Sequence, residues 1–165
     1  MIILGVDPGT GCTGYGFIRT PSTLVGCGTI RPPSKATLEA KLLFITERLG
    51  ELISEHRPEQ CAVENIFHAV NAHSALILGH IRGAIIVTAM RLGCDVHGYS
   101  ALQIKKAVTG HGKAEKEQVR KMVLLLLNLQ DQKMAIDSSD ALAAAICHAE
   151  TSRTLDRMAR MESGR

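Results

Sequence analysis

The sequence predicts one α/β domain in which a mixed sheet of five strands carries helices on both faces. Three observations lead to this fold class: the first 30 residues contain three strand-like segments, two further strands then alternate with helices, and the chain ends in helices. With 165 residues, of which 45% are hydrophobic and 21% charged, the chain has the size and composition of a single globular domain.

The first three strands are predicted at 2–6, 14–19 and 24–30. The first is an uninterrupted apolar run, which is typical of a strand that is buried on both faces. Turns that contain Gly, Thr and Pro separate the three segments, so we expect them to form an antiparallel meander.

The rest of the chain alternates between helices and strands. Apolar residues three and four apart indicate the helices, and short apolar runs indicate the strands. The predicted order is helix 35–56, strand 60–64, helix 71–92, strand 95–99, and helices 101–108, 115–129 and 138–150. Residues 151–165 resemble a frayed helix or a tail, so we divide the chain into a folded domain, 1–150, and a short basic C-terminal tail.

The helix predicted at 71–92 is apolar around much of its circumference. Asn71 or Ser74 marks its start, and Gly93 lies just past its end. One face of a sheet does not need so much apolar surface. We therefore expect part of this helix to be deeply buried or to form an oligomer interface.

Composition argues against several classes of protein. No apolar run exceeds seven residues, far short of the roughly 18 that a membrane span needs, so no membrane association is expected. The N-terminus lacks the basic region and the longer apolar stretch of a signal peptide. The five cysteines are an odd number without a C-x-x-C pair, which indicates reduced thiols in a cytoplasmic protein.

Two carboxylates lie at the ends of buried strands. Asp7 ends the first strand, and Glu64 ends the fourth. If these strands are parallel neighbours, both side chains emerge at the carboxyl edge of the sheet. Open sheets that contain parallel strands tend to bind their ligands at this edge.

Two further acids, Asp137 and Asp140, lie three residues apart near the start of a predicted helix and therefore share a face. They have two interpretations. Asp137 can cap the helix while Asp140 interacts with the positive end of the helix dipole. Alternatively, the apolar residues that follow bury this end of the helix and bring both acids to the edge of the sheet.

Four carboxylates at one edge repel each other and raise each other's pKa unless cations compensate their charge. Mg²⁺ prefers oxygen ligands and commonly shares them with a substrate phosphate. Two such ions, roughly 4 Å apart, can stabilise the attacking and leaving oxygens of an in-line phosphoryl displacement. The four acids thus indicate metal-dependent phosphodiester hydrolysis, and the seven histidines show no zinc-binding pattern.

The glycine-rich segment after Asp7 is either a tight hairpin or a cradle for phosphate. It leads into a strand rather than a helix and has no G-K-[ST] ending. A phosphotransferase of the actin or sugar-kinase type also opens with an Asp-x-Gly hairpin. Such an enzyme needs two domains around its nucleotide, however, and 165 residues do not supply them.

Basic residues are concentrated between positions 105 and 121, where six Lys and Arg accompany two Glu, a net charge of +4. A basic, glycine-containing loop that enters a helix is suited to a phosphate backbone, although a solvated helix surface is the alternative. The whole chain carries +3, and without the four acids it carries +7, which places a basic surface around an acidic site. Phe67, three residues past Glu64, can stack on an unpaired base or anchor its loop in the core.

Taken in order, these motifs resemble the RuvC family of bacterial Holliday-junction resolvases, of the RNase H-like superfamily. The similarity extends from residue 2 to about 148 and includes departures at Ala101 and at Ser138-Ser139. The matching segments are Gly5-Val-Asp7-Pro-Gly9, Thr13-Gly14-Tyr-Gly16, Val63-Glu64-x-x-Phe67, Asn71, Ser74-Ala-Leu, Leu78-Gly79, Arg82-Gly83, Gly110-x-Gly112-x-Ala114-x-Lys116 and Asp137-x-x-Asp140-Ala-Leu-Ala.

The resemblance implies an RNase H-like fold and the activity of a crossover junction endodeoxyribonuclease, which resolves four-way DNA junctions by paired symmetric nicks in recombination and repair. It implies that the catalytic residues, which would also bind two Mg²⁺ ions, are Asp7, Glu64, Asp137 and Asp140. We expect Mn²⁺ to substitute for Mg²⁺. The residues expected to contact DNA are Phe67, Lys105, Lys113, Lys116 and Arg120.

The resemblance also implies a homodimer through the helix at 71–92, which matches the symmetry of a junction that is cut on two strands. A branch-migration complex, RuvA–RuvB, is the implied protein partner. Two other functions remain open from the residues alone. One is a junction-binding module without catalysis, in which the acids are caps and turn residues; the other is an RNase H-like nuclease that acts on RNA or RNA–DNA hybrids.

Overall fold

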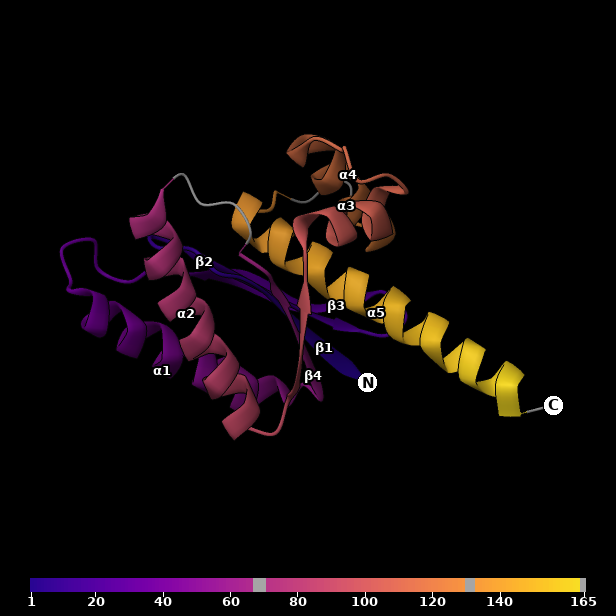
Figure 1. Ribbon diagram of the computed structural model, residues 1–165, viewed down its shortest axis with the longest axis horizontal. Helices are drawn as coiled ribbons and strands as arrows, with labels where there is room; N and C mark the ends of the chain where they lie inside the picture. The colour runs from indigo at the N-terminus through magenta and orange to yellow at the C-terminus, as the bar shows by residue number, and fades with distance from the viewer. Residues whose placement is uncertain (67–70, 130–132, 164–165) are drawn as a thin grey trace.

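The structure, a computed structural model, describes residues 1–66, 71–129 and 133–163 and contains a five-stranded mixed sheet with helices on both faces (Figure 1). The strands are β1 (Ile2–Asp7), β2 (Thr13–Arg19), β3 (Thr23–Ile30), β4 (Gln60–Glu64) and β5 (Asp95–Tyr99). Their order in the sheet is β3-β2-β1-β4-β5. The predicted fold class is confirmed, and every predicted strand lies within one residue of its observed ends.

The pairing of the strands brings the two strand-end acids to one edge. β1, β2 and β3 form the predicted antiparallel meander, whereas β1 is parallel to β4, and β4 is parallel to β5. In the parallel pair, Val6 lies opposite Val63. Asp7 and Glu64 directly follow these two residues, so they emerge side by side at the carboxyl edge of the sheet.

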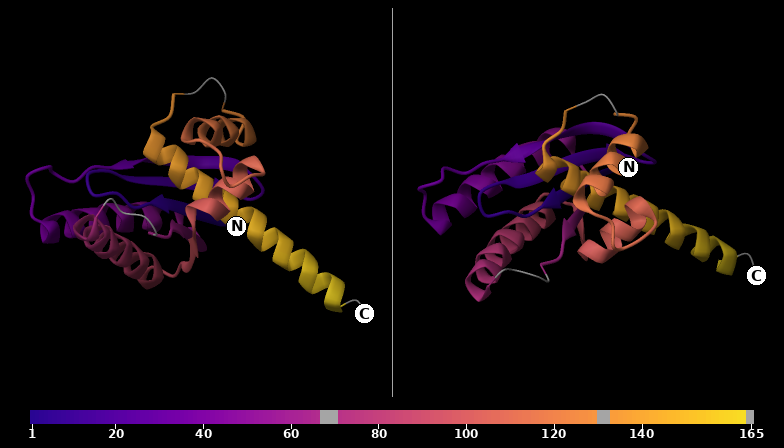
Figure 2. Two further views of the ribbon diagram at one scale, coloured as in Figure 1. Left: turned by 45° about the horizontal axis from the view of Figure 1, so that its top comes forward. Right: turned by 90° about the horizontal axis from the view of Figure 1, so that it is seen from above.

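Each face of the sheet has its own layer of helices (Figure 1; Figure 2). The helices are α1 (Leu38–His56), α2 (Ala72–Arg91), α3 (Ala101–Thr109), α4 (Lys116–Leu126) and α5 (Ile136–Ser163). One core lies between the sheet and α1 and α2, around Leu4, Leu49 and Ile85. The other lies between the sheet and α3, α4 and α5, and includes Ile3 and Leu142.

α5 lies directly on β1 and β2 because the strands present glycines to it. A Cβ added at Gly5 would come within 1.9 Å of the carbonyl oxygen of Ala141, and one at Gly14 within 1.9 Å of that of Asp137. Only glycine permits so close an approach of two backbones. The start of α5 is thereby held against the strand ends that carry Asp7.

Three helices differ from their predicted ends by more than one residue. α1 begins at Leu38 rather than near 35, because Thr37 caps it by accepting a hydrogen bond from the backbone N–H of Ala40. α4 ends at Leu126 rather than near 129, because Asn128 adopts a left-handed conformation (φ 56°) that stops the helix. α5 begins at Ile136 rather than 138 and continues to Ser163, although we predicted its end at 150. Burial ceases at Ala149, but the residues up to 163 include no Gly or Pro that would end a helix, so α5 extends beyond the sheet (Figure 2). The division into a domain, 1–150, and a tail stays a prediction.

α2 begins at an N-cap on Asn71, whose side chain accepts a hydrogen bond from the backbone N–H of Ser74 (2.9 Å). One stripe of α2 is buried, whereas Leu76, Val87 and Met90 are each more than half exposed. The expectation that part of this helix is deeply buried is therefore confirmed at Ile81, Ile85 and Ala89, and a large apolar surface is left open besides. By length and composition alone α2 would also qualify as a membrane span, which is a weak indication for one helix that packs on α1.

Candidate active site

Three of the four predicted acids meet in one cavity. Asp7 comes from the end of β1, Glu64 from the end of β4, and Asp140 from the first turns of α5. These side chains line a cavity of about 420 Å³, together with Lys105 and Lys116. A second cavity, of about 560 Å³, shares Asp7 and Glu64 and extends toward the start of α3. The two cavities thus meet at the strand-end acids and leave space for a substrate beside them.

The three acids stand in a repulsive electrostatic environment. Burial, the charge of Glu64 and that of Asp140 raise the pKa of Asp7 from 3.8 to about 7. Burial also raises the pKa of Glu64, with Asp140 as the next cause, and it raises the pKa of Asp140 despite the opposing charge of Lys116. Three carboxylates that resist ionisation in one cavity call for cations nearby.

Lys116 is the cation with the strongest effect on these acids, and Lys105 lowers the pKa of Glu64 and of Asp140 to a smaller extent. Nζ of Lys116 lies 3.5 Å from Oδ2 of Asp140, and the charge of Asp140 is the main cause that raises the pKa of Lys116. The Lys116 side chain is 78% exposed, so it reaches the acids from solvent rather than being enclosed with them. Two lysines offset only part of three negative charges.

The three carboxylates of the cavity have the donor atoms that a divalent metal ion requires. Carboxylate oxygens are the ligands that Mg²⁺ and Mn²⁺ prefer, and the raised pKa values show that the protein alone does not compensate the charges. Within residues 1–66, 71–129 and 133–163, however, no three His, Cys, Asp or Glu side chains are grouped closely enough to hold one ion as they stand. Small side-chain rotations would accompany metal binding.

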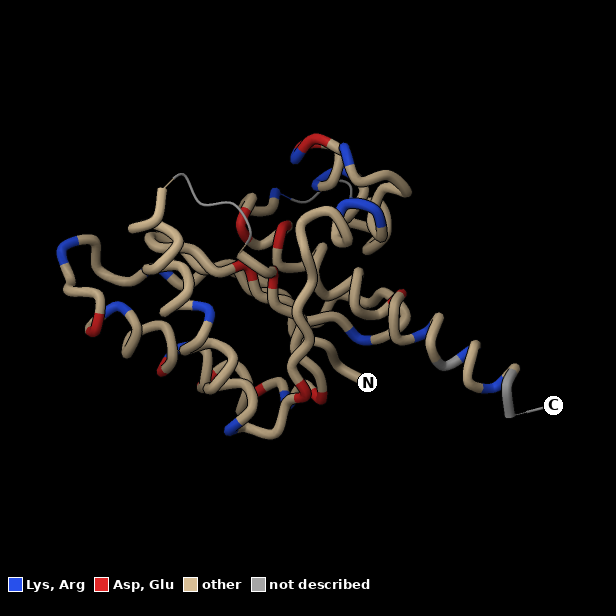
Figure 3. The backbone as a smooth tube through the Cα atoms, in the orientation of Figure 1, with Lys and Arg blue, Asp and Glu red and all other residues tan. Residues whose placement is uncertain are grey.

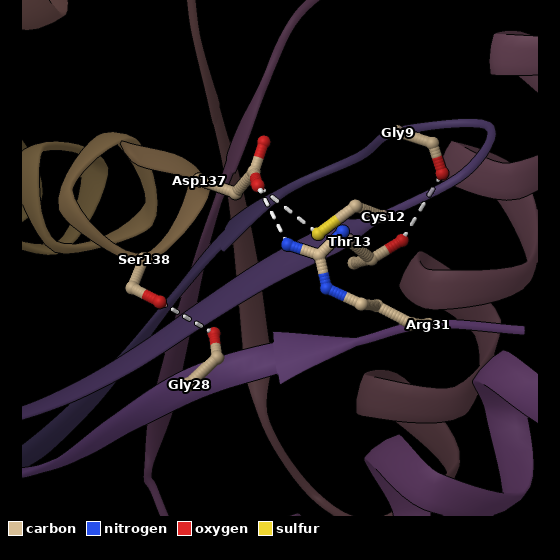
Figure 4. A network of polar contacts seen from close by, with 7 residues as sticks. All are labelled: Gly9, Cys12, Thr13, Gly28, Arg31, Asp137 and Ser138. Atoms are coloured by element: carbon tan, nitrogen blue, oxygen red, sulfur yellow. Dashed lines mark hydrogen bonds and ion pairs between the residues drawn. The ribbon is translucent and has the colours of Figure 1, made fainter. Parts of the chain in front are cut away.

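Asp137 has different partners from the other three acids (Figure 4). The thiol of Cys12 donates a hydrogen bond to its Oδ2 at 3.0 Å, and Nη2 of Arg31 lies 3.6 Å from the same oxygen. Its carboxylate acts on Asp7 only as the weakest of the causes that raise the pKa of Asp7. The interpretation of Asp137 as a helix cap is wrong, because α5 already begins at Ile136 and the side chain bonds to other strands and loops.

The glycine-rich segment between β1 and β2 is a hairpin connection, as one of the two interpretations held. The hydroxyl of Thr13 donates to the carbonyl of Gly9 (3.3 Å), which closes the loop. Contact of this loop with phosphate stays a prediction.

The start of α5 is also bound to β3. The hydroxyl of Ser138 donates a hydrogen bond to the carbonyl of Gly28 (2.9 Å).

Cys12 and Arg31, which hold Asp137, were not among the predicted site residues. Their contacts join residues more than 100 positions apart, so no local spacing signals them. The only signal in the sequence was their position, since Cys12 directly precedes β2 and Arg31 directly follows β3.

The residues predicted to contact DNA lie mostly on α3, α4 and the loop between them. Lys113 and Lys116 are exposed, and Lys105 lines the cavity. Figure 3 shows basic segments on α3 and α4 beside the acidic segments at the sheet edge. Arg120 is partly buried and donates to the carbonyl of Met134 (2.8 Å), so part of its hydrogen-bonding capacity is used within the protein. Phe67 lies outside the described residues.

Comparisons with known proteins point to one family. A family model, "Crossover junction endodeoxyribonuclease RuvC", matches residues 3–148. The chain is 49% identical over 162 residues to the crossover junction endodeoxyribonuclease RuvC of Marinobacter nauticus, with 96% of this chain and 91% of that protein covered. It is similar to the Thermus thermophilus RuvC structure (TM-score 0.85) and to that protein in complex with Holliday junction substrate (TM-score 0.87). Both are 31% identical to it, with 93% of this chain and 96% of theirs covered.

Proposed function

Since the chain belongs to the RuvC family of crossover junction endodeoxyribonucleases, we propose that it resolves four-way DNA junctions by hydrolysing one phosphodiester bond on each of two strands. The observation that carries the proposal is the convergence of Asp7, Glu64 and Asp140 in one cavity beside Lys116. A junction-binding module without catalysis would have no reason to keep three mutually repelling acids partly buried.

We infer that the site uses two divalent cations, Mg²⁺ or Mn²⁺, which when bound would supply Lewis-acid stabilisation of the attacking and leaving oxygens. Asp7, on which the charges of both Glu64 and Asp140 act, would be shared by the two ions. Glu64 and Asp140 would each complete one side. Asp137 would join them by leaving Cys12 and Arg31, as its neighbour position on α5 permits.

The protein groups around these acids have separate tasks. The ammonium of Lys116, now paired with Asp140, would contact a non-bridging oxygen of the scissile phosphate, and Lys105 lines the same cavity. Lys113 lies in the exposed loop before α4, where it is suited to the DNA backbone away from the cut. Phe67 and Arg120 remain predicted DNA contacts.

We propose that two copies pair through the exposed apolar stripe of α2, which includes Leu76, Val87 and Met90. A two-fold dimer suits a two-fold junction because each copy carries one site and the junction needs two cuts. The RuvA–RuvB complex as partner and a cytoplasmic location are further proposals. The five free cysteines fit a reducing compartment.

The test compares three substrates in the presence of Mg²⁺: a mobile four-way DNA junction, linear duplex DNA and an RNA–DNA hybrid. We expect cleavage of the junction alone, with nicks at matching positions on two strands. Junction binding without products would favour the non-catalytic module, and preferred cleavage of the hybrid would favour the ribonuclease. Single, unpaired nicks would contradict the dimer.

A further inference from the structure

Arg82 connects helix α2 to the end of strand β4. It stands between Ile81 and Gly83 in an otherwise largely apolar part of α2, and its side chain points into the domain rather than along the open stripe. Its Nε donates to the backbone carbonyl of Glu64 (3.2 Å), and its Nη2 donates to Oδ1 of Asn65 (2.7 Å). One guanidinium thus holds two consecutive residues, the first of which carries a site carboxylate.

The neighbouring strand makes room for this contact. A Cβ added at Gly98 of β5 would lie 2.5 Å from Oδ1 of Asn65 and 3.0 Å from Nη2 of Arg82. The backbone N–H of Asn65 donates to the carbonyl of Tyr99 (2.7 Å), which fixes the same turn from the other side. The end of β4 is therefore held by α2 and β5 together, at the point where the chain leaves the sheet.

We propose that Arg82 is a positioning residue for the metal site: by holding the backbone of Glu64 and the side chain of Asn65, it fixes the direction in which the Glu64 carboxylate enters the cavity. This inference rests on the proposed function, in which Glu64 binds a cation. Asn65 also lines the larger cavity, so the same contact shapes the wall that faces the substrate.

The planar fork of the guanidinium is essential to this role. Arginine directs two separate N–H groups at two fixed acceptors, whereas the ammonium of lysine is a single point of donation on a more flexible stem. Groups that orient a metal ligand by hydrogen bonding, without touching the metal, commonly contribute 10- to 100-fold to metal affinity. We therefore expect Arg82→Ala to weaken cation binding by about tenfold or more, and Arg82→Lys to give an intermediate loss.

The experiment measures the binding of Mn²⁺ to the full-length protein, with free Mn²⁺ quantified by electron paramagnetic resonance. Arg82→Ala, Arg82→Lys and Gly98→Ala are compared with two matched controls. Arg48→Ala removes an exposed arginine that pairs with Glu51 on the same helix, and Gly26→Ala adds a Cβ to a strand where His56 lies in ordinary contact. Circular dichroism and thermal unfolding establish that each variant is folded.

We expect the two Arg82 variants and Gly98→Ala to weaken Mn²⁺ binding while both controls stay within about twofold of the unaltered protein. In junction cleavage, the loss should appear in the rate and be recovered by raising Mn²⁺, because a misdirected ligand still binds at higher concentration. The affinity for junction DNA without cations should not change. If Arg82→Ala fails to fold, Arg82→Lys and Gly98→Ala carry the test.

Unchanged Mn²⁺ affinity in a folded Arg82→Ala, or in both Arg82→Lys and Gly98→Ala, would overturn the positioning role while leaving the proposed function intact. A loss of cleavage that excess Mn²⁺ does not recover would overturn it as well. If the unaltered protein neither binds Mn²⁺ nor cleaves the junction, the proposed function fails, and this inference fails with it.

Discussion

Two acids one helical turn apart on α5 meet opposite surroundings. Asp140 faces the cavity, its side chain is 19% exposed, and burial raises its pKa. Asp137 is 36% exposed and turns to the thiol of Cys12 and the guanidinium of Arg31. Each acid has one cationic partner, Lys116 for Asp140 and Arg31 for Asp137. Only Asp140, however, shares its cavity with two further carboxylates, those of Asp7 and Glu64. The segments packed against α5, and not α5 itself, therefore decide which of the two acids is ready for a cation.

The largest effect is expected from replacing Asp7, which lines both cavities. Asp7→Asn should lower cleavage of a four-way junction in Mg²⁺ by at least about a thousandfold, because an amide is a poor cation ligand, while junction binding is retained. Nicking of end-labelled strands and gel-shift binding measure the two effects. Undiminished nicking by this variant would refute the site.

The second prediction concerns the stability of the cation-free protein. The folded-state pKa of Asp7 is raised from 3.8 to about 7, so its stabilising contribution is present at acidic pH and is lost as the pH rises through about 7. At pH 8 with a chelator, Asp7→Asn should therefore be more stable than the unaltered protein, by about 2 kcal/mol after partial screening by water and Lys116.

Urea unfolding at pH 8 measures this difference. Asp137→Asn is the matched control: it should lower stability slightly, by about 0.5 kcal/mol, because it weakens exposed pairing with Arg31. Equal effects of the two substitutions on stability would mean that the environment of Asp7 in the cavity is no more repulsive than that of Asp137 beside Arg31.

The third prediction concerns pH and cation binding. Because burial and the acids Glu64, Asp140 and Asp137 raise the pKa of Asp7 to about 7 against the opposing charge of Lys116, protons compete with cations for it near neutrality. Mn²⁺ affinity should fall by about tenfold between pH 8 and pH 6. Titrations at fixed ionic strength measure it, and an affinity that is flat over this range would show that Asp7 is already ionised.

The smallest expected effect concerns the contact that holds Asp137 away from the cavity. Arg31→Ala should strengthen Mn²⁺ binding by about threefold, because a partly exposed ion pair no longer competes for the carboxylate. In Arg31→Ala combined with Asp137→Asn the gain should vanish. A gain that persists in the double variant would mean that Arg31 acts through its charge and not through Asp137.

Much of the fold could be predicted because its signals are local. Apolar runs identified all five strands, and the positions of Asp7 and Glu64 at strand ends placed both at one edge once a parallel pairing was assumed. The predicted end of α5 at 150 was wrong because burial stops there while helix formation does not. A pattern of buried residues reports packing, and a helix continues without packing when nothing in its sequence ends it.

Residue type and short spacing were enough to predict the order of the elements, the four candidate acids and the basic stretch beside them. They did not predict that Asp140 enters the cavity while Asp137 turns to Arg31, or that Arg82 holds the backbone of Glu64. These contacts join residues far apart in the chain. Their geometry depends on how closely α5 approaches glycines of β1 and β2 and on where α2 crosses the end of β4, and no local pattern encodes either distance.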